Sequence, residues 1–275
     1  MARSAAGKWN ARIGLAWIAL VWTVLGALGG CAGPAPGSSP GHDIITESDE
    51  PEARRRARLR MELAVGYFGE GKTSVALDEV KQVIAIDPTF PEAYNLRGLI
   101  YMRLNDAPQA EASFRHAVAL NPKDADTQHN YGWFLCQERR YEDAQRAFDV
   151  AMANPMYAGR AKTLMAQGVC QARAGRLADA ERSLSRSYEL DAGNPVTEYN
   201  LARVLYLRGE YPRAKFYIRR LNNSELANAE SLWLGMKVEH RLNDKLALRQ
   251  LGDQLKKRFA RSREAAQYDR GAFDD

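Results

Sequence analysis

The most constraining feature of the sequence is a spacing that recurs along most of the chain. In six places a small residue, Gly or Ala, stands twelve positions before an Ala. The small residues are Ala64, Gly98, Gly132, Gly168, Ala202 and Gly235, and their partners are Ala76, Ala110, Ala144, Ala180, Ala214 and Ala247. Both series advance by 34, 34, 36, 34 and 33 residues, which indicates six copies of one structural unit.

A period near 34 residues is typical of tetratricopeptide repeats, in which each unit is a pair of antiparallel helices. A large side chain at either small position would hold the two helices apart. Glycine inside a helix costs about 1 kcal/mol relative to alanine, so its recurrence in register indicates a packing requirement. The predicted fold is therefore all-α, a right-handed superhelical solenoid of six tetratricopeptide repeats.

One register position between the two helices of each unit favours residues that tolerate the left-handed backbone conformation. This position is occupied by Gly71, Asn105, Gly175 and Gly209. In the third and sixth repeats it holds Arg139 and Leu242, which break the rule.

Residues 1–30 are predicted to be a lipoprotein signal peptide. Three basic residues precede an apolar run at 13–28, which is shorter than the ~20 residues that a spanning helix needs. The run ends at Leu28-Gly29-Gly30-Cys31, which resembles a bacterial lipobox. In such a motif the chain is cut before the cysteine, and Cys31 would then carry the lipid, including palmitate. The alternative is an uncleaved signal anchor with Cys31 as a bystander.

The rest of the chain divides into three predicted parts. Residues 31–52 are rich in Pro, Gly, Ser and acidic residues and predict a flexible tether. Residues 53–260 form the six-repeat array. Residues 261–275 form a charged C-terminal tail, expected as a solvated helix that frays.

The charge balance gives no indication of a nucleic-acid partner. The net charge of +5 includes Arg3, Lys8 and Arg12 of the predicted signal. Without them, 36 basic residues face 34 acidic ones, a net charge of +2. We therefore expect neither nucleic-acid binding nor a polybasic membrane patch.

The sequence also lacks the motifs of common catalytic sites. It contains no HExxH, G-x-S-x-G, GxxxxGK[ST] or GxGxxG pattern, and its four histidines form no cluster with metal-ligand spacing. We expect a protein that is not an enzyme and that binds no cofactor and no metal. His129 stands early in a first helix, either lining a groove or as a plain surface histidine.

Cys136 and Cys170 fall in the first helices of consecutive repeats. An oxidising compartment permits a disulfide, which needs Cα atoms within about 7 Å, whereas neighbouring helices pack about 8–10 Å apart. We therefore expect two buried, small apolar residues rather than a disulfide.

Function is expected to lie in the concave groove that the first helices line. The inward positions there are mostly apolar or aromatic, which suits an amphipathic helix or an extended hydrophobic peptide. Some of these side chains are expected to pack between repeats. The predicted partner-binding residues are Met61, Val65, Phe68, Leu99, Met102, His129, Trp133, Met165, Tyr199 and Tyr206.

A lipobox, a short tether and six repeats together resemble the type IV pilus biogenesis lipoproteins of the PilW/PilF family. The resemblance is closest in the stretches NYGWFLCQERRYEDA (130–144) and NPMYAGRAKTLMAQGVCQARAGRLADAERSL (154–184), the second with a two-residue insertion. It implies a monomeric pilotin that binds the secretin subunit of the pilus and brings it to the outer membrane. Ala32, in place of Asp, fits lipoprotein sorting to the periplasmic face of that membrane.

Two other functions remain open at this point. One is a lipid-anchored scaffold for envelope or cell-wall enzymes, and the other is an accessory subunit that modulates a hydrolase. Copurification would discriminate between the pilotin and these two alternatives. A copurified secretin would support the pilotin, and a peptidoglycan synthase or hydrolase would support the alternatives.

Overall fold

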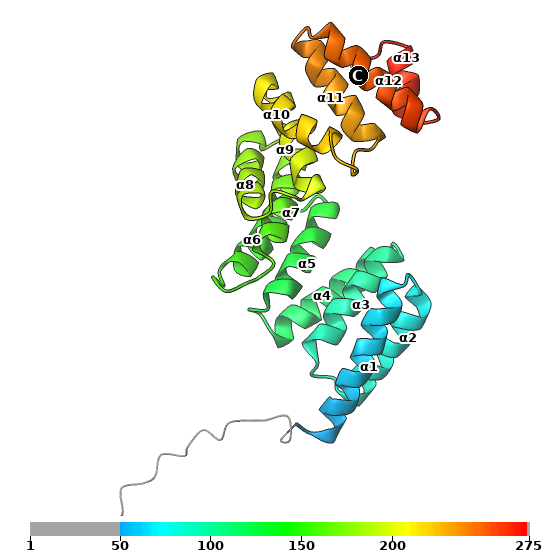
Figure 1. Cartoon of the computed structure of the whole chain (residues 1–275). Coiled ribbons are helices and arrows are strands. Elements are labelled where there is room, and N and C mark those ends of the chain that lie inside the picture. The colour runs from blue at the N-terminus through cyan, green and yellow to red at the C-terminus, as the bar shows by residue number, and fades with distance from the viewer. Residues whose placement is uncertain (1–49, 274–275) are drawn as a thin grey trace, which may run out of the picture. The chain divides into compact units, whose positions relative to one another are not determined.

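The computed structural model describes residues 50–273, which lie within a compact unit formed by residues 47–275. The predicted signal peptide, Cys31 and most of the predicted tether lie outside the described residues. Every regular element of the described part is a helix (Figure 1). The helices are α1 (Glu52–Gly69), α2 (Thr73–Ile86), α3 (Pro91–Arg103), α4 (Ala107–Leu120), α5 (Ala125–Gln137), α6 (Tyr141–Met152), α7 (Arg160–Arg173), α8 (Leu177–Leu190), α9 (Pro195–Leu207), α10 (Tyr211–Asn222), α11 (Ala229–Arg241), α12 (Lys245–Phe259) and α13 (Arg263–Asp269).

Helices α1 to α12 form six consecutive antiparallel pairs, which confirms the predicted class of fold (Figure 1). Each odd-numbered helix from α1 to α9 also contacts the first helix of the next repeat, as α3 contacts α5 and α5 contacts α7. Among the described residues, the second helices make no such contacts with one another. The first helices therefore lie closer together, and the array curves with them on its inner side.

The small residues of the repeat lie where the two helices of a pair meet. A Cβ atom added at Gly98 would lie 2.7 Å from the Phe114 ring, and one at Gly132 would lie 2.9 Å from the Phe148 ring. At Gly168 it would lie 2.6 Å from Leu184 Cγ. Phe114, Phe148 and Leu184 are fully buried, so they have no room to move aside. In repeats two to four the glycine is thus required by the packing of its own pair, whereas a Cβ atom at Gly235 would lie 2.6 Å from Asn222 of α10, in the preceding repeat.

This packing predicts the effect of Gly168→Val. Helix propensity alone would favour the change, but the added side chain must displace Leu184 or the α8 backbone. We expect the free energy of unfolding, measured by urea denaturation, to fall by about 2–3 kcal/mol. Gly66 is the control, because no atom lies within 4 Å of an added Cβ there. Gly66→Ala should raise stability by about 1 kcal/mol, and equal effects of the two changes would contradict this account.

The turns within the repeats follow the predicted rule with two instructive departures. Gly71, Gly175 and Gly209 have φ of 77–78°, and Asn105 has φ of 58°. Arg139 takes the same left-handed conformation with φ of 59°, so the repeat geometry overrides the preference of the residue there. In the sixth repeat the conformation falls on Asn243, one residue after the predicted Leu242.

The expectation of a solvated, fraying C-terminal tail is wrong for the described part of this segment. Ala265 of α13 is 3% exposed, and the Tyr268 ring lies directly on Gly252 of α12. Phe273 stacks on Trp233, with ring centroids 5.1 Å apart, and on His240 at 4.6 Å. These residues cover the end of the last pair, as a cap does in repeat proteins.

The expectation of two unlinked cysteines is also wrong, because Cys136 and Cys170 form a disulfide. Their Cα atoms are 5.7 Å apart, although packed helices are typically about 8–10 Å apart between their axes. The axis distance overestimates the separation of two residues that face each other at a crossing point. The bond joins α5 to α7 across the boundary between the third and fourth repeats.

Candidate partner-binding groove

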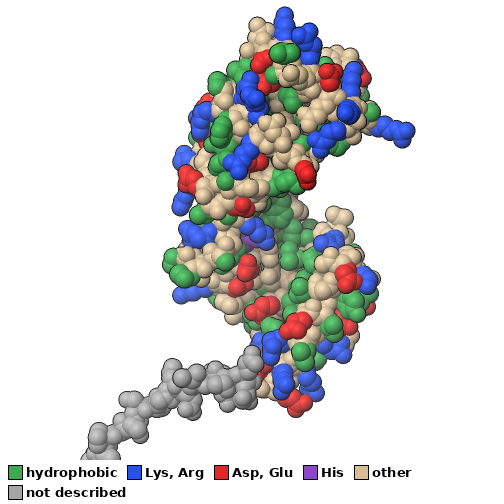
Figure 2. Space-filling model, viewed as in Figure 1, with side chains coloured by type: hydrophobic (Ala, Val, Ile, Leu, Met, Phe, Trp, Pro, Cys, Tyr) green, Lys and Arg blue, Asp and Glu red, His purple; other side chains and the backbone are tan. Residues whose placement is uncertain are grey.

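The predicted groove residues lie on the first helices and most of them are half-buried. The half-buried ones are Met61, Phe68, Leu99, Met102, Trp133, Met165, Tyr199 and Tyr206. Val65 is more open, with 52% of its surface exposed. Figure 2 shows hydrophobic side chains gathered in the hollow of the array, with Lys and Arg side chains around it.

The half-buried residues fall into three groups, each of which packs on a different part of the core. Met61 and Phe68 pack on the core of the first repeats. Leu99, Met102 and Trp133 pack on the central cluster that contains both cysteines. Met165, Tyr199 and Tyr206 pack on the cluster of the fourth to sixth repeats. Each of these side chains therefore packs on the core with one part of its surface, and another part is exposed to solvent.

Three aromatic rings of the groove each have a cation above them from the following repeat. The Arg103 guanidinium lies 3.8 Å from the centroid of the Phe68 ring. Arg173 lies 5.2 Å from the Trp133 ring, and Lys237 lies 5.6 Å from the Tyr206 ring. Each contact contributes about 0.5–1 kcal/mol at an exposed site and orients the ring. The groove thus combines apolar surface with positive charge.

Sequence reasoning did not identify these cations. The sequence did contain a signal for them: a basic residue follows each of these aromatic groove residues at a distance of about one repeat. Two further apolar side chains of α1, Leu59 and Leu63, are 54% and 53% exposed, and Leu63 lies on the side of the helix away from the groove residue Val65.

His129 does not line the groove and is not a surface residue either, because only 4% of it is exposed. Its Nδ1 lies 2.9 Å from Thr163 Oγ1, and Thr163 also donates to the Tyr157 hydroxyl at 3.4 Å. Tyr157 in turn donates to Asp126 at 3.2 Å. Tyr157 belongs to the longer connection between α6 and α7, where the repeat period is 36 residues instead of 34. Tyr157 of this longer connection is thus linked to His129 through the Thr163 hydroxyl.

Burial lowers the pKa of the His129 imidazole to about 4, and repulsion by Lys162 adds to this effect. The unfolded chain, with a histidine pKa near 6.5, binds this proton more readily than the folded protein does. The contribution of His129 to the free energy of unfolding is therefore fully present above about pH 7. It is lost as the pH falls from about 6.5 to 4, by up to about 3 kcal/mol. Urea denaturation across this range should show a shallower pH dependence for His129→Gln. Parallel curves for the two proteins would contradict the prediction.

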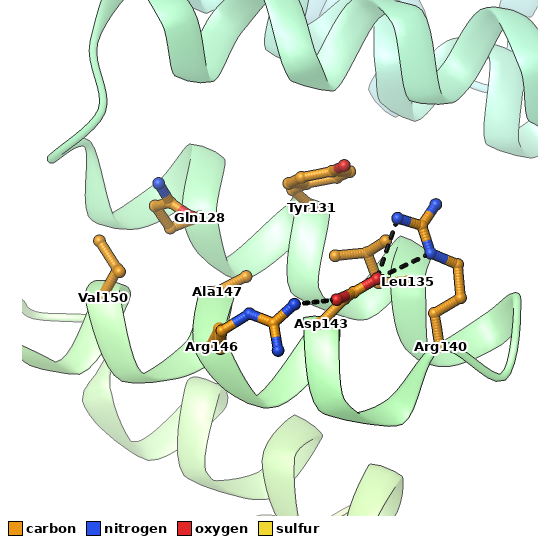
Figure 3. Close-up of a pocket in the computed structure, with 8 residues that line it drawn as sticks. All are labelled: Gln128, Tyr131, Leu135, Arg140, Asp143, Arg146, Ala147 and Val150. Atoms are coloured by element: carbon orange, nitrogen blue, oxygen red, sulfur yellow. Dashed lines mark hydrogen bonds and ion pairs between the residues drawn. The ribbon is translucent and has the colours of Figure 1, made fainter.

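A separate cavity of about 300 Å³ lies between α5 and α6 (Figure 3). Tyr131 and Leu135 line it together with Arg140, Asp143 and Arg146. Both arginines pair with Asp143, and Arg140 also pairs with Glu111 at 2.6 Å. Its positive charges are therefore already neutralised within the protein.

Within residues 50–273 there is no cluster of three or more His, Cys, Asp or Glu side chains placed to hold a metal ion. No helix in the same part of the chain is both long and apolar enough to cross a membrane.

Comparison with known proteins supports the repeat architecture. Three tetratricopeptide repeat family models match residues 91–124, 113–146 and 135–195. The type IV pilus assembly protein PilF of Pseudomonas aeruginosa is 26% identical over 250 residues, covering 91% of this chain and 96% of that protein.

Two solved structures are similar over most of their length. The crystal structure of PilW, described as a widely conserved type IV pilus biogenesis factor, has a TM-score of 0.74 at 29% identity. The match covers 78% of this chain and 98% of PilW. The structure of Pseudomonas aeruginosa PilF has a TM-score of 0.72 at 25% identity, covering 80% of this chain and all of that one.

The paired helices and the groove define a tetratricopeptide-repeat scaffold protein. Both solved relatives are matched over 98–100% of their own length, which extends the likeness well beyond a few repeats. The chain is thus similar to PilF and PilW over nearly the whole length of both proteins.

Proposed function

We propose that this protein is an outer-membrane lipoprotein pilotin, which binds the secretin subunit of a type IV pilus and promotes its localisation and multimerisation. The observation that carries the proposal is the row of partly uncovered apolar side chains along the first helices. Such a row suits an amphipathic or extended hydrophobic segment that would otherwise aggregate. Similarity to a pilus assembly protein and to a pilus biogenesis factor supports the choice of partner.

Two parts of the protein would have separate roles. Acyl chains on Cys31 would anchor the protein in the membrane, because each buried methylene contributes about 0.8 kcal/mol. The groove would hold the secretin segment during transit. The methionines of the groove are unbranched and polarisable, so they can adapt to the shape of the bound segment.

The groove is tested with two matched substitutions on α1. Val65 and Leu63 are 52% and 53% exposed, and because helical residues advance by about 100° each, they point to nearly opposite sides of the helix. Val65→Asp should reduce secretin multimers, detected on immunoblots of envelope extracts, by about tenfold, the loss expected for one buried charge without a partner. Leu63→Asp should leave them unchanged.

Both variants should keep the helical circular dichroism of the wild type, since neither side chain is buried. Leu99 and Trp133 are less suitable for this test, because they also pack on the central core. If Leu63→Asp is as harmful as Val65→Asp, or Val65→Asp is harmless, the groove does not bind the secretin. Copurification of a peptidoglycan synthase or hydrolase in place of a secretin would favour an enzyme scaffold.

The lipid anchor needs its own test, because it does not depend on the groove. Cells fed a palmitate analogue should label the wild-type protein, and Cys31→Ala should lose both the label and the membrane association. A Cys31→Ala protein that still sediments with the membrane would contradict the anchor.

A further inference from the structure

A cavity of about 430 Å³ lies at the C-terminal end of the array, between α9, α11 and α13. Its walls include Tyr199, Arg203, Tyr206, Trp233, Lys237 and Arg263. Helix α13 therefore contributes one wall, so the segment that covers the end of the array also completes this cavity. In Figure 1, α11 and α13 both belong to the last, orange and red part of the array.

Arg203 and Lys237 both line this cavity, and they lie close enough for their positive charges to act on each other. Burial lowers the pKa of Lys237, and the nearby charge of Arg203 lowers it further. Neither side chain forms an ion pair with any residue of the described part of the chain. The arginines of the cavity between α5 and α6 are different, because Asp143 and Glu111 neutralise them. Two like charges held together without a counter-ion favour a bound anion.

Two acidic residues, Glu230 and Glu264, line the same cavity. Their charges, after the larger effect of burial, raise the pKa of Tyr199. Neither acid is among the groups that shift the pKa of Lys237. Arg203 opposes this effect on Tyr199, so charges of both signs lie near Tyr199, whereas the only charge that shifts the pKa of Lys237 is the positive charge of Arg203.

Each of two aromatic residues of the cavity has a neighbour that orients its ring. Trp233 is only 6% exposed and stacks on Phe273. Tyr206 lies below the Lys237 ammonium and 5.6 Å from it. A carboxylate bound here would replace part of the water lost by Lys237 with a charge-assisted hydrogen bond.

We propose that this cavity binds an acidic side chain, Asp or Glu, of a partner polypeptide, with Arg203 and Lys237 holding the carboxylate. The site goes beyond the proposed function, because it adds recognition of a negative charge at the end of the groove, whichever protein occupies the groove. Secretin capture and this site can therefore fail separately.

A small probe tests the site without knowledge of the partner. Full-length ¹⁵N-labelled protein is titrated with N-acetyl-glutamate N-methylamide, and in parallel with its neutral match, N-acetyl-glutamine N-methylamide. The signal is the indole N–H resonance that disappears in Trp233→Phe, with the Trp133 indole as an internal reference. We expect a saturable shift of the Trp233 signal at millimolar glutamate probe and at least about tenfold weaker binding of the glutamine probe.

Lys237→Met keeps most of the aliphatic stem and should weaken glutamate binding about tenfold, as should Arg203→Gln on the exposed edge. Lys257→Met and Arg186→Gln are matched controls, because they remove the same charge from exposed positions on α12 and α8. Both controls should bind as the wild type does. Equal binding of the two probes, equal shifts of the two indoles, or wild-type binding by Lys237→Met and Arg203→Gln would each overturn the proposal.

Discussion

Replacing both Cys136 and Cys170 with alanine is expected to lower the free energy of unfolding by about 3–4 kcal/mol, since their disulfide closes a loop across a sequence separation of 34 residues. In a domain of this size the loss corresponds to a fall of about 10 °C in the melting temperature. Both residues are buried, and alanine keeps their apolar character. Most of the effect should therefore come from the lost link and little from lost packing.

Reduction provides the control for this prediction. The wild-type protein in excess reductant should melt near the temperature of the double variant, and reductant should leave the double variant unchanged. Thiol counting under denaturing, non-reducing conditions should find neither Cys136 nor Cys170 free. A wild-type protein whose melting is insensitive to reductant would contradict the assigned contribution.

Removal of residues 261–275 is the second change with a large expected effect. It takes away Ala265, Tyr268 and Phe273, which cover a core cluster at the end of the array. We expect a local loss of about 3–5 kcal/mol for α11 and α12, from exposure of this apolar surface. Amide hydrogen exchange in these helices should accelerate about 10²–10³-fold.

The effect should stay local, because each repeat contacts only its neighbours. Amides of α3 to α6 should therefore exchange at wild-type rates. Asp269→Asn is the matched control, because it breaks only the exposed pair between Lys256 and Asp269 and should have little effect. If the truncated protein keeps the protection of α11, the C-terminal segment does not act as a cap.

The sequence was sufficient to predict the helix pairs because their packing has a local cause. A small residue, Gly or Ala, must stand where two helices meet, and the spacing of those residues gives both the period and the pairing. The close contacts of Gly98 with Phe114 and of Gly168 with Leu184 explain that spacing. The left-handed turn at Arg139 was not predicted, because the residue type argues against it, and the geometry of the repeat imposes it there.

The errors arose where contacts between repeats decide the structure. The disulfide forms because the Cα atoms of Cys136 and Cys170 are only 5.7 Å apart where α5 and α7 cross. The mean distance between the axes of packed helices does not reveal so close an approach. His129 stood at an inward register position, but the structure buries it near the Phe148 ring and joins it to Thr163 of the next repeat. The charged composition of the C-terminal segment concealed Tyr268 and Phe273, whose partners Gly252 and Trp233 lie in preceding helices.

The covalent link between α5 and α7 has a mechanical consequence for the whole array. A solenoid behaves as a spring, since small rotations at every junction between units add up to large changes of pitch. A bond across one junction stiffens the third and fourth repeats against each other and leaves the junctions on either side free to twist. Strain applied by a bound polypeptide should therefore concentrate in the first and last repeats, and the two ends should flex independently about a rigid centre.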